Sequence, residues 1–173
     1  IAARKQAASK VAGLYVIVDP ELTQGRGVIE VARAALRGGA TAIQLRDKAH
    51  DKGDQLPITR QLRDICEEHD AVFIVNDHAD LAVACNAHGL HVGQHDLPVH
   101  EARRILGPHQ FIGTSNALLQ EAQASLTQGA DYIAVGAMYD TTSKGNTRPA
   151  GIEALRRVKQ AIPGVPIVAI GGI

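Results

Sequence analysis

Seven short apolar runs recur along the chain, and none of them strictly alternates apolar and polar residues. Separated by stretches of helical periodicity, the runs are 14–18, 42–45, 72–75, 89–92, 111–113, 132–135 and 167–170. Runs of this kind are typical of strands buried on both faces, as in parallel sheets covered by helices. The order strand, helix, strand therefore predicts an α/β fold, either a (β/α)₈ barrel or an open doubly wound sheet.

Polar or small residues follow nearly every run, and this distribution favours the barrel. The residues in these positions are Asp19, Arg46, Asn76, Gln94, Ser115, Asp140 and Gly171. A barrel gathers groups from all its strand ends onto one rim, whereas an open sheet concentrates them at one switch point. The first run continues as DPEL at 19–22, without the glycine pattern of a dinucleotide-binding turn. We therefore expect a (β/α)₈ TIM barrel.

The length of 173 residues suits one domain but is short for a complete barrel. Such barrels usually have about 250 residues, with about 200 as a lower limit. We expect residues 1–173 to form a single barrel domain with strands 1 to 7. The eighth strand and its helix are expected to be missing, so that the domain is incomplete at its C-terminus.

Composition excludes several classes of function. The 18 Lys and Arg residues balance 18 Asp and Glu residues, and there is no Trp, so neither nucleic acid nor an anionic membrane is an expected partner. No apolar run approaches the roughly 20 residues that cross a bilayer. Two cysteines and no visible signal peptide predict a cytoplasmic protein. A homo-oligomer stays open.

The segment QLRDK at 44–48 is the first candidate for chemistry. Alternation along a strand sends Gln44 and Arg46 to one side, and Lys48 follows in the loop. Two cations beside an amide suit a phosphorylated substrate, since Arg offers a fork of donors and Lys a mobile charge. The alternative is a solvated loop in which Asp47 pairs with these cations, and the residues alone favour neither.

Asp77 and Asp96 follow the third and fourth runs and form the second candidate. Neighbouring barrel strands would place them on adjacent loops, where two carboxylates can bind Mg²⁺ together with water and substrate phosphate. The alternative is that each Asp caps the helix that follows it, a role that Asp commonly plays. Taken by itself, the capping role is slightly favoured.

Hydroxyl groups and a lysine gather after the sixth run, at 141–144 (TTSK). Such a loop can bind a phosphate through side-chain and backbone donors, although the Walker A spacing is absent. Its alternative is a simple connection to the next helix. Gly171 and Gly172 would let backbone amides approach a phosphate after the seventh run. The eight histidines fit no common zinc spacing.

Taken together, these segments resemble the thiamine phosphate synthase family. The matching stretches are LYVIVD at 14–19, QLRDK at 44–48, FIVNDHADLA at 73–82, GLHVGQHDLP at 89–98, IGTS at 112–115, GADYIAVG at 129–136, TTSK at 141–144 and VAIGGI at 168–173. Their order and spacing hold over about 160 residues. No single stretch is decisive, but the set is specific.

The resemblance implies a Mg²⁺-dependent transferase of thiamine biosynthesis that joins a hydroxymethylpyrimidine diphosphate to a thiazole phosphate and releases pyrophosphate. It assigns pyrimidine diphosphate contacts to Gln44, Leu45, Arg46, Asp47, Lys48, Asn76, Ser115 and Lys144. Arg46, Lys48 and Lys144 would be the catalytic cations. It assigns the thiazole phosphate to Thr141, Thr142, Ser143 and Gly172, and Mg²⁺ to Asp77 and Asp96.

One departure and two alternatives accompany the resemblance. The family usually has Gly-Pro where this chain has Gly136 and Ala137, so we expect a less rigid loop there. The related thiazole tautomerase shares the barrel but needs an acid-base residue instead of a cation cluster. A non-catalytic phosphate-binding module is the other alternative. Pyrophosphate release from the two substrates separates all three.

Overall fold

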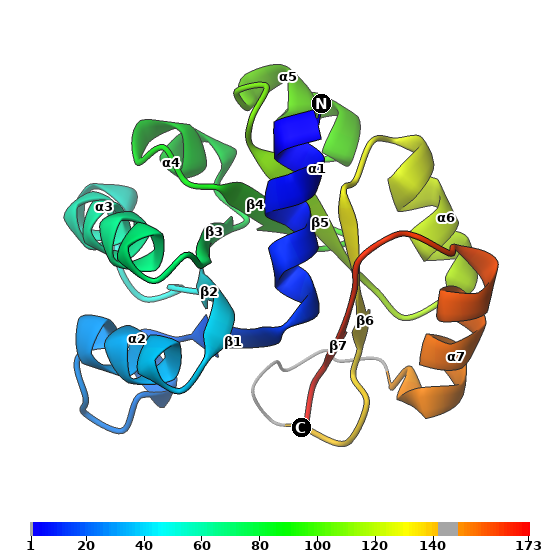
Figure 1. Cartoon of the computed structure of the whole chain (residues 1–173), viewed down its shortest axis with the longest axis horizontal. Helices are drawn as coiled ribbons and strands as arrows, with labels where there is room; N and C mark the ends of the chain where they lie inside the picture. The colour runs from blue at the N-terminus through cyan, green and yellow to red at the C-terminus, as the bar shows by residue number, and fades with distance from the viewer. Residues whose placement is uncertain (1, 142–148) are drawn as a thin grey trace.

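A computed structural model describes residues 2–141 and 149–173, which contain one sheet of seven parallel strands. The strands are β1 (Leu14–Val18), β2 (Ala40–Leu45), β3 (Val72–Asn76), β4 (Gly89–Val92), β5 (Phe111–Asn116), β6 (Tyr132–Gly136) and β7 (Ile167–Ile170). They are hydrogen-bonded in sequence order. The sheet curls into a nearly closed barrel surrounded by helices (Figure 1), which confirms the predicted architecture.

Six helices connect the strands, and one precedes them. The connecting helices are α2 (Val28–Arg37), α3 (Lys52–Glu68), α4 (Ala79–Ala84), α5 (Val99–Ile105), α6 (Leu119–Thr127) and α7 (Gly151–Ala161). The chain begins with α1 (Ala2–Ser9), and two short 3₁₀ helices are η1 (Lys10–Ala12) and η2 (Pro20–Leu22). Across 2–141 and 149–173, no helix combines the length and apolar character that a membrane crossing requires.

Several strands are longer than their apolar runs predicted. β5 extends to Asn116, because Ser115 and Asn116 continue the parallel register opposite Ala134 and Val135 of β6. The backbone ladder therefore continues where the apolar sequence stops. This extension carries polar side chains to the carboxyl ends of the strands.

Both faces of the sheet are buried, which explains the absence of alternation in the sequence. Ile43 and Leu45 of β2 face outward and pack in the core shared with the helices. Ala42, Ile74 and Tyr132 belong to a second core inside the barrel. Apolar residues are therefore needed at consecutive positions of each inner strand.

Inside the barrel, aromatic rings occupy space that neighbouring glycines leave open. A Cβ atom on Gly113 would lie 1.9 Å from the ring of Tyr132, and one on Gly89 would lie 2.3 Å from the ring of Phe111. The two rings meet edge to face at a centroid distance of 5.9 Å. Small and large residues thus alternate across the interior, as in other small barrels.

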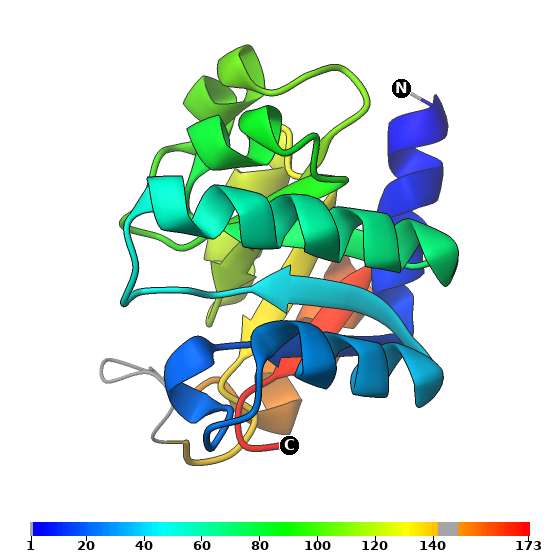
Figure 2. The ribbon, with the colours of Figure 1, turned by 90° about the vertical axis from the view of Figure 1, so that its left-hand side faces the viewer.

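Helix α1, which the sequence did not predict, covers the end of the barrel at which the strands begin (Figure 2). Ala8 and Val11 are buried among the residues of the interior core. The Arg4 side chain donates to Asp131, directly before β6, over 2.9 Å. Because α1 covers this end, the opposite end, formed by the carboxyl ends of the strands, is the place for a ligand.

Candidate active site

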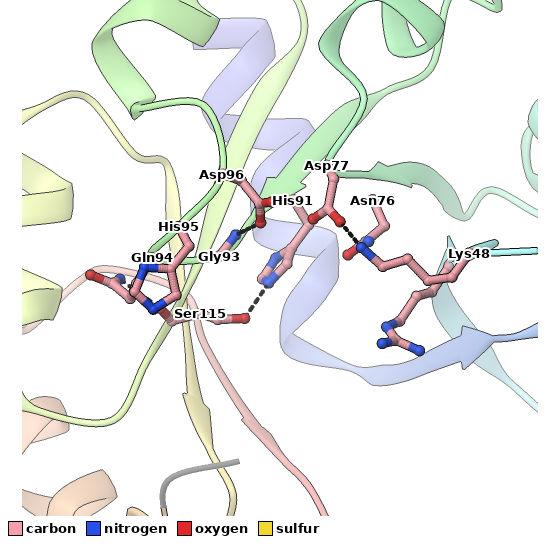
Figure 3. A pocket seen from close by; sticks show the side chains of 10 residues that line it. Lys48, Asn76, Asp77, His91, Gly93, Gln94, His95, Asp96 and Ser115 are labelled. Atoms are coloured by element: carbon pink, nitrogen blue, oxygen red, sulfur yellow. Dashed lines mark hydrogen bonds and ion pairs between the residues drawn. The ribbon is translucent and has the colours of Figure 1, made fainter. Parts of the chain in front are cut away.

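A pocket of about 180 Å³ lies at the carboxyl ends of β2 to β5 (Figure 3). Its lining consists of Arg46, Lys48, Asn76, Asp77, His91, Gly93, Gln94, His95, Asp96 and Ser115. Six of these were predicted from the sequence, namely Arg46, Lys48, Asn76, Asp77, Asp96 and Ser115. The barrel therefore brings residues that are up to 69 positions apart into one cavity, as expected when parallel strands end on one rim.

Arg46 is held at this rim by an ion pair that crosses from β2 to β1. Its guanidinium donates to Oδ2 of Asp19 over 2.5 Å, and Asp19 is buried. The other oxygen, Oδ1, accepts from the backbone N–H of Glu21, which fixes the carboxylate. A guanidinium has five N–H donors, so Arg46 keeps the capacity to bind a phosphate as well.

Lys48 and Asp77 form a second ion pair across the pocket, in which the lysine ammonium donates to the carboxylate (Figure 3). The backbone N–H of Asp77 donates to the carbonyl of His91 over 2.8 Å, which ties the loop after β3 to β4. Asp77 does not cap α4, whose N-cap residue is His78. The capping alternative is thus wrong for Asp77, and its carboxylate faces the pocket.

Asp96 also serves its own loop and not the next helix. Its Oδ2 accepts from the backbone N–H of Gly93 over 2.7 Å, while the N-cap residue of α5 is Pro98. The capping alternative is therefore wrong for Asp96 too, because the bond closes the turn that precedes the helix. With Asp77, it gives the pocket two carboxylates on adjacent loops.

Asp77 and Asp96 are the carboxylates of this pocket that could hold a divalent cation. Across the described parts of the chain, no group of three or more His, Cys, Asp or Glu side chains is placed to bind a metal. Mg²⁺ needs fewer protein ligands, since it commonly binds one or two carboxylates together with water and phosphate oxygens. Asp77 already attracts the Lys48 ammonium, which shows that this carboxylate is accessible to a cation.

A row of polar side chains lies beneath the pocket, inside the barrel. Gln44 donates to the hydroxyl of Tyr15 over 2.7 Å, and this hydroxyl lies 2.9 Å from that of Tyr132. The Tyr132 hydroxyl is 2.7 Å from Nδ1 of His91, whose Nε2 lies 2.8 Å from Oγ of Ser115. Burial raises the pKa of Tyr15 and Tyr132 well above the usual value, so both hydroxyls keep their protons.

Three members of this row, Tyr15, Tyr132 and His91, were not among the site residues predicted from the sequence. The alternation of side chains along a strand could have identified His91, because it lies two positions after Gly89 and therefore on the same, inward face of β4. Gln44 was predicted to contact substrate, and the structure places it 1% exposed beneath the residues that line the pocket.

Leu45 and Asp47, also predicted to contact the pyrimidine diphosphate, do not line the pocket. Leu45 points to the outer face of β2, as alternation requires, and packs in the core below the helices. The Asp47 carboxylate accepts from the backbone N–H groups of Ala49 and His50 over 3.0 and 3.1 Å. It therefore shapes the loop after β2. Arg46 and Lys48 donate to Asp19 and Asp77 instead.

The predicted thiazole-phosphate residues are described in part. Gly172 has a φ of +72°, and a Cβ atom there would lie 2.8 Å from both the Asp140 carbonyl oxygen and Cβ of Tyr139. The Tyr139 N–H donates to the carbonyl of Gly171 over 3.0 Å. The glycines thus lie against the segment that leads to Thr141. Thr142, Ser143 and Lys144 lie outside the described residues.

A barrel of parallel strands with a charged pocket at their carboxyl ends defines the class of (β/α)-barrel enzymes. Within this class, the family model described as thiamine monophosphate synthase (TMP-TENI) matches residues 14–173, and the chain belongs to this family. The match covers all seven strands.

Individual relatives agree with this assignment. A thiamine-phosphate synthase of Moorella thermoacetica is 45% identical over 161 residues, covering 92% of this chain and 76% of the relative. One from Methanoregula boonei is 47% identical over 161 residues, covering 92% and 74%. Among solved structures, thiamine phosphate pyrophosphorylase from Pyrococcus furiosus superimposes with a TM-score of 0.86 at 38% identity, covering 96% of this chain and 77% of the other.

Proposed function

We propose that this chain condenses 4-amino-5-hydroxymethyl-2-methylpyrimidine diphosphate with 4-methyl-5-(2-hydroxyethyl)thiazole phosphate to give thiamine phosphate and pyrophosphate. Membership of the thiamine monophosphate synthase family supports this reaction. The observation that carries it is the pocket itself, where two cations and two carboxylates, Arg46, Lys48, Asp77 and Asp96, converge from different strand ends. A diphosphate with a bound divalent cation matches this set of charges.

The reaction requires stabilisation of a leaving group more than it requires a general base. The bond between the pyrimidine methylene carbon and the diphosphate oxygen breaks, and its electron pair leaves with pyrophosphate. The thiazole nitrogen then donates its lone pair to the resulting carbocation and forms the new carbon–nitrogen bond. Negative charge grows on the departing oxygens, so preorganised cations bind the transition state more strongly than the substrate.

Among the residues that the structure describes, Arg46 and Lys48 are the cations that stabilise the departing oxygens. Asp19 fixes the Arg46 guanidinium before substrate arrives, which lowers the cost of reorganisation. Asp77 and Asp96 would hold Mg²⁺, which would neutralise part of the diphosphate charge when bound. Lys48, which pairs with Asp77 in this structure, would supply a further positive charge to the diphosphate. The resemblance adds Lys144 as a third cation.

The same proposal limits the partners and the location of the protein. Its partners are small phosphorylated molecules, since a pocket of about 180 Å³ lined by charged and polar groups suits them. We infer a cytoplasmic location, because Cys66 and Cys85 are both free and buried, as thiols are in a reducing compartment.

Pyrophosphate release tests the proposal directly. The chain is incubated with both substrates and with each alone, over a range of Mg²⁺ concentrations. Release that requires both substrates and rises with Mg²⁺ is the expected result. Isomerisation of a thiazole compound alone would instead indicate a tautomerase. Release that is independent of Mg²⁺ would refute the metal role of Asp77 and Asp96 while leaving the condensation in place.

A further inference from the structure

Five polar side chains form a continuous row of hydrogen bonds through the interior of the barrel. The row runs from Gln44 through Tyr15, Tyr132 and His91 to Ser115, and its last two members line the pocket. Burying so many polar groups is costly unless every donor meets an acceptor. In such a row each group donates its hydrogen to the next, so all the hydrogens point the same way. The group at the inner end decides which way that is.

The inner end of the row is a donor. The amide nitrogen of Gln44 only donates, so the Tyr15 oxygen accepts and its single hydrogen is directed to the Tyr132 oxygen. Tyr132 in turn has its hydrogen available for Nδ1 of His91. Raised pKa values keep both phenols protonated, so neither hydrogen is lost from the row.

The outer end of the row follows from the chemistry of imidazole. A neutral ring whose Nδ1 accepts carries its hydrogen on Nε2, which faces Oγ of Ser115. Ser115 then accepts from His91, and its own hydrogen is available to the pocket that it lines. With the opposite direction, the Ser115 hydrogen would be held by His91.

We propose that this row fixes Ser115 as a hydrogen-bond donor to a diphosphate oxygen of the substrate, with His91 as the positioning residue that sets its direction. The inference rests on the proposed function for the identity of the ligand. Diphosphate oxygens only accept hydrogen bonds, so only this direction lets Ser115 bind them through its own hydrogen. His91 acts through Ser115, since both of its ring nitrogens are engaged within the row.

The tautomer of His91 tests the direction in the ligand-free protein. Nitrogen NMR of the histidine-labelled chain, with His91 assigned by its loss in His91→Gln, should show a neutral ring protonated on Nε2. Tyr132→Phe removes the donor to Nδ1 and should abolish this preference. Tyr139→Phe makes the same chemical change at a tyrosine that is 56% exposed, and should leave the His91 signals unchanged. A proton on Nδ1 in the wild-type protein would mean that Gln44 accepts from Tyr15, and would overturn the proposal.

Kinetics test whether His91 acts through Ser115. His91→Leu should lower kcat/KM for pyrophosphate release about tenfold, the size expected when a hydrogen bond to a charged group is weakened. The Gln side chain keeps a donor near the position of Nε2, so His91→Gln should retain most of the rate. In a Ser115→Ala background, His91→Leu should cause no further loss. Losses that multiply in the double variant would overturn the proposal, because His91 would then act independently of Ser115.

The two measurements also separate this proposal from the proposed function. The tautomer is read without substrate, so it decides the direction of the row even in a protein that releases no pyrophosphate. Absence of pyrophosphate release in the wild-type chain would refute the function and, with it, the diphosphate ligand of Ser115.

Discussion

Asp131 and Asp77 lie at opposite ends of the barrel and are used in opposite ways. Asp131, directly before β6, has a side chain that is 4% exposed and accepts from Arg4, Arg103 and the backbone N–H of Ile112 over 2.6 to 2.9 Å. Asp77, directly after β3, pairs with a lysine that is 45% exposed and lines an open pocket. The protein itself satisfies the first carboxylate, while the second can still exchange its partner for a ligand.

This difference separates stability from function along the barrel axis. At the end where the strands begin, α1 fills the opening, and the ion pair between Arg4 and Asp131 holds it in place. At the other end the same strands carry cations and carboxylates around a cavity. Barrel enzymes in general place chemistry at the carboxyl ends and stability at the opposite face. Three Asp→Asn substitutions, which change charge at nearly constant volume, test this separation.

The largest effect is expected at Asp77. Asp77→Asn should lower kcat for pyrophosphate release by about 100-fold or more, since it removes a carboxylate proposed to hold Mg²⁺ at the leaving diphosphate. Its free energy of unfolding should change by no more than about 1 kcal/mol, because the partner Lys48 is half exposed. Asn also tolerates the φ of +61° at this position. Wild-type turnover in this variant would show that the carboxylate has no part in the reaction.

Asp131→Asn should produce the opposite pattern. Removing this buried charge leaves Arg4 and Arg103 without their carboxylate, a change that typically costs about 3 kcal/mol. Denaturant unfolding measures this loss, and kcat of the folded fraction should stay at the wild-type value. A large drop in kcat with unchanged stability would contradict the separation of the two ends.

A smaller loss should follow from acid at the same end of the barrel. His88 accepts from the backbone N–H of Phe73 through Nδ1, and burial lowers its pKa below the usual 6.5. The unfolded chain therefore binds a proton more readily, so stability is full above pH 6.5 and falls as the pH drops through the folded pKa. The charged groups around it are Glu67, Arg63, Lys10 and His109.

Thermal unfolding across this pH range measures the effect, with His88→Gln as the control that lacks the titrating ring. The difference in stability between wild type and control should shrink as the pH falls. A constant difference across the range would show that His88 does not carry this pH dependence.

The smallest effect is expected at Asp70, which also lies at the covered end. Its side chain is 93% exposed and pairs with Lys10, so Asp70→Asn should change the free energy of unfolding by less than about 1 kcal/mol. Asp70 and Asp131 both precede a strand at the same end of the barrel, so comparing the two variants shows whether burial or position decides the loss of stability. A loss as large as that of Asp131→Asn would show that exposure does not decide the contribution of these ion pairs.

The sequence predicted the strands well because burial on both faces leaves a clear apolar signal. It also predicted that Arg46, Asp77 and Ser115 would meet, since the carboxyl ends of parallel strands share one rim. Helix α1 was missed because its buried residues, such as Ala8, gain their role only from the barrel end that they cover. That role depends on contacts distant in sequence.

The interior polar residues were harder to predict for a related reason. Tyr15 and Tyr132 look like ordinary apolar members of a strand, and their hydrogen bond joins positions 117 residues apart. Asp47 shows the opposite case: its place beside two cations suggested a site residue, but its carboxylate accepts from the backbone of its own loop. Local spacing does not reveal which partner a short polar side chain selects.

The ring-and-glycine pairs inside the barrel have a consequence for how this sequence can change over generations. The two positions of each pair, Gly113 with Tyr132 and Gly89 with Phe111, constrain each other, since any side chain on the glycine collides with the ring. Shrinking the ring first would leave a cavity that costs about 3 to 5 kcal/mol, a large part of the stability of a typical domain. A single substitution at either position is therefore unfavourable. Related sequences that change one member of a pair should carry a compensating change in the other.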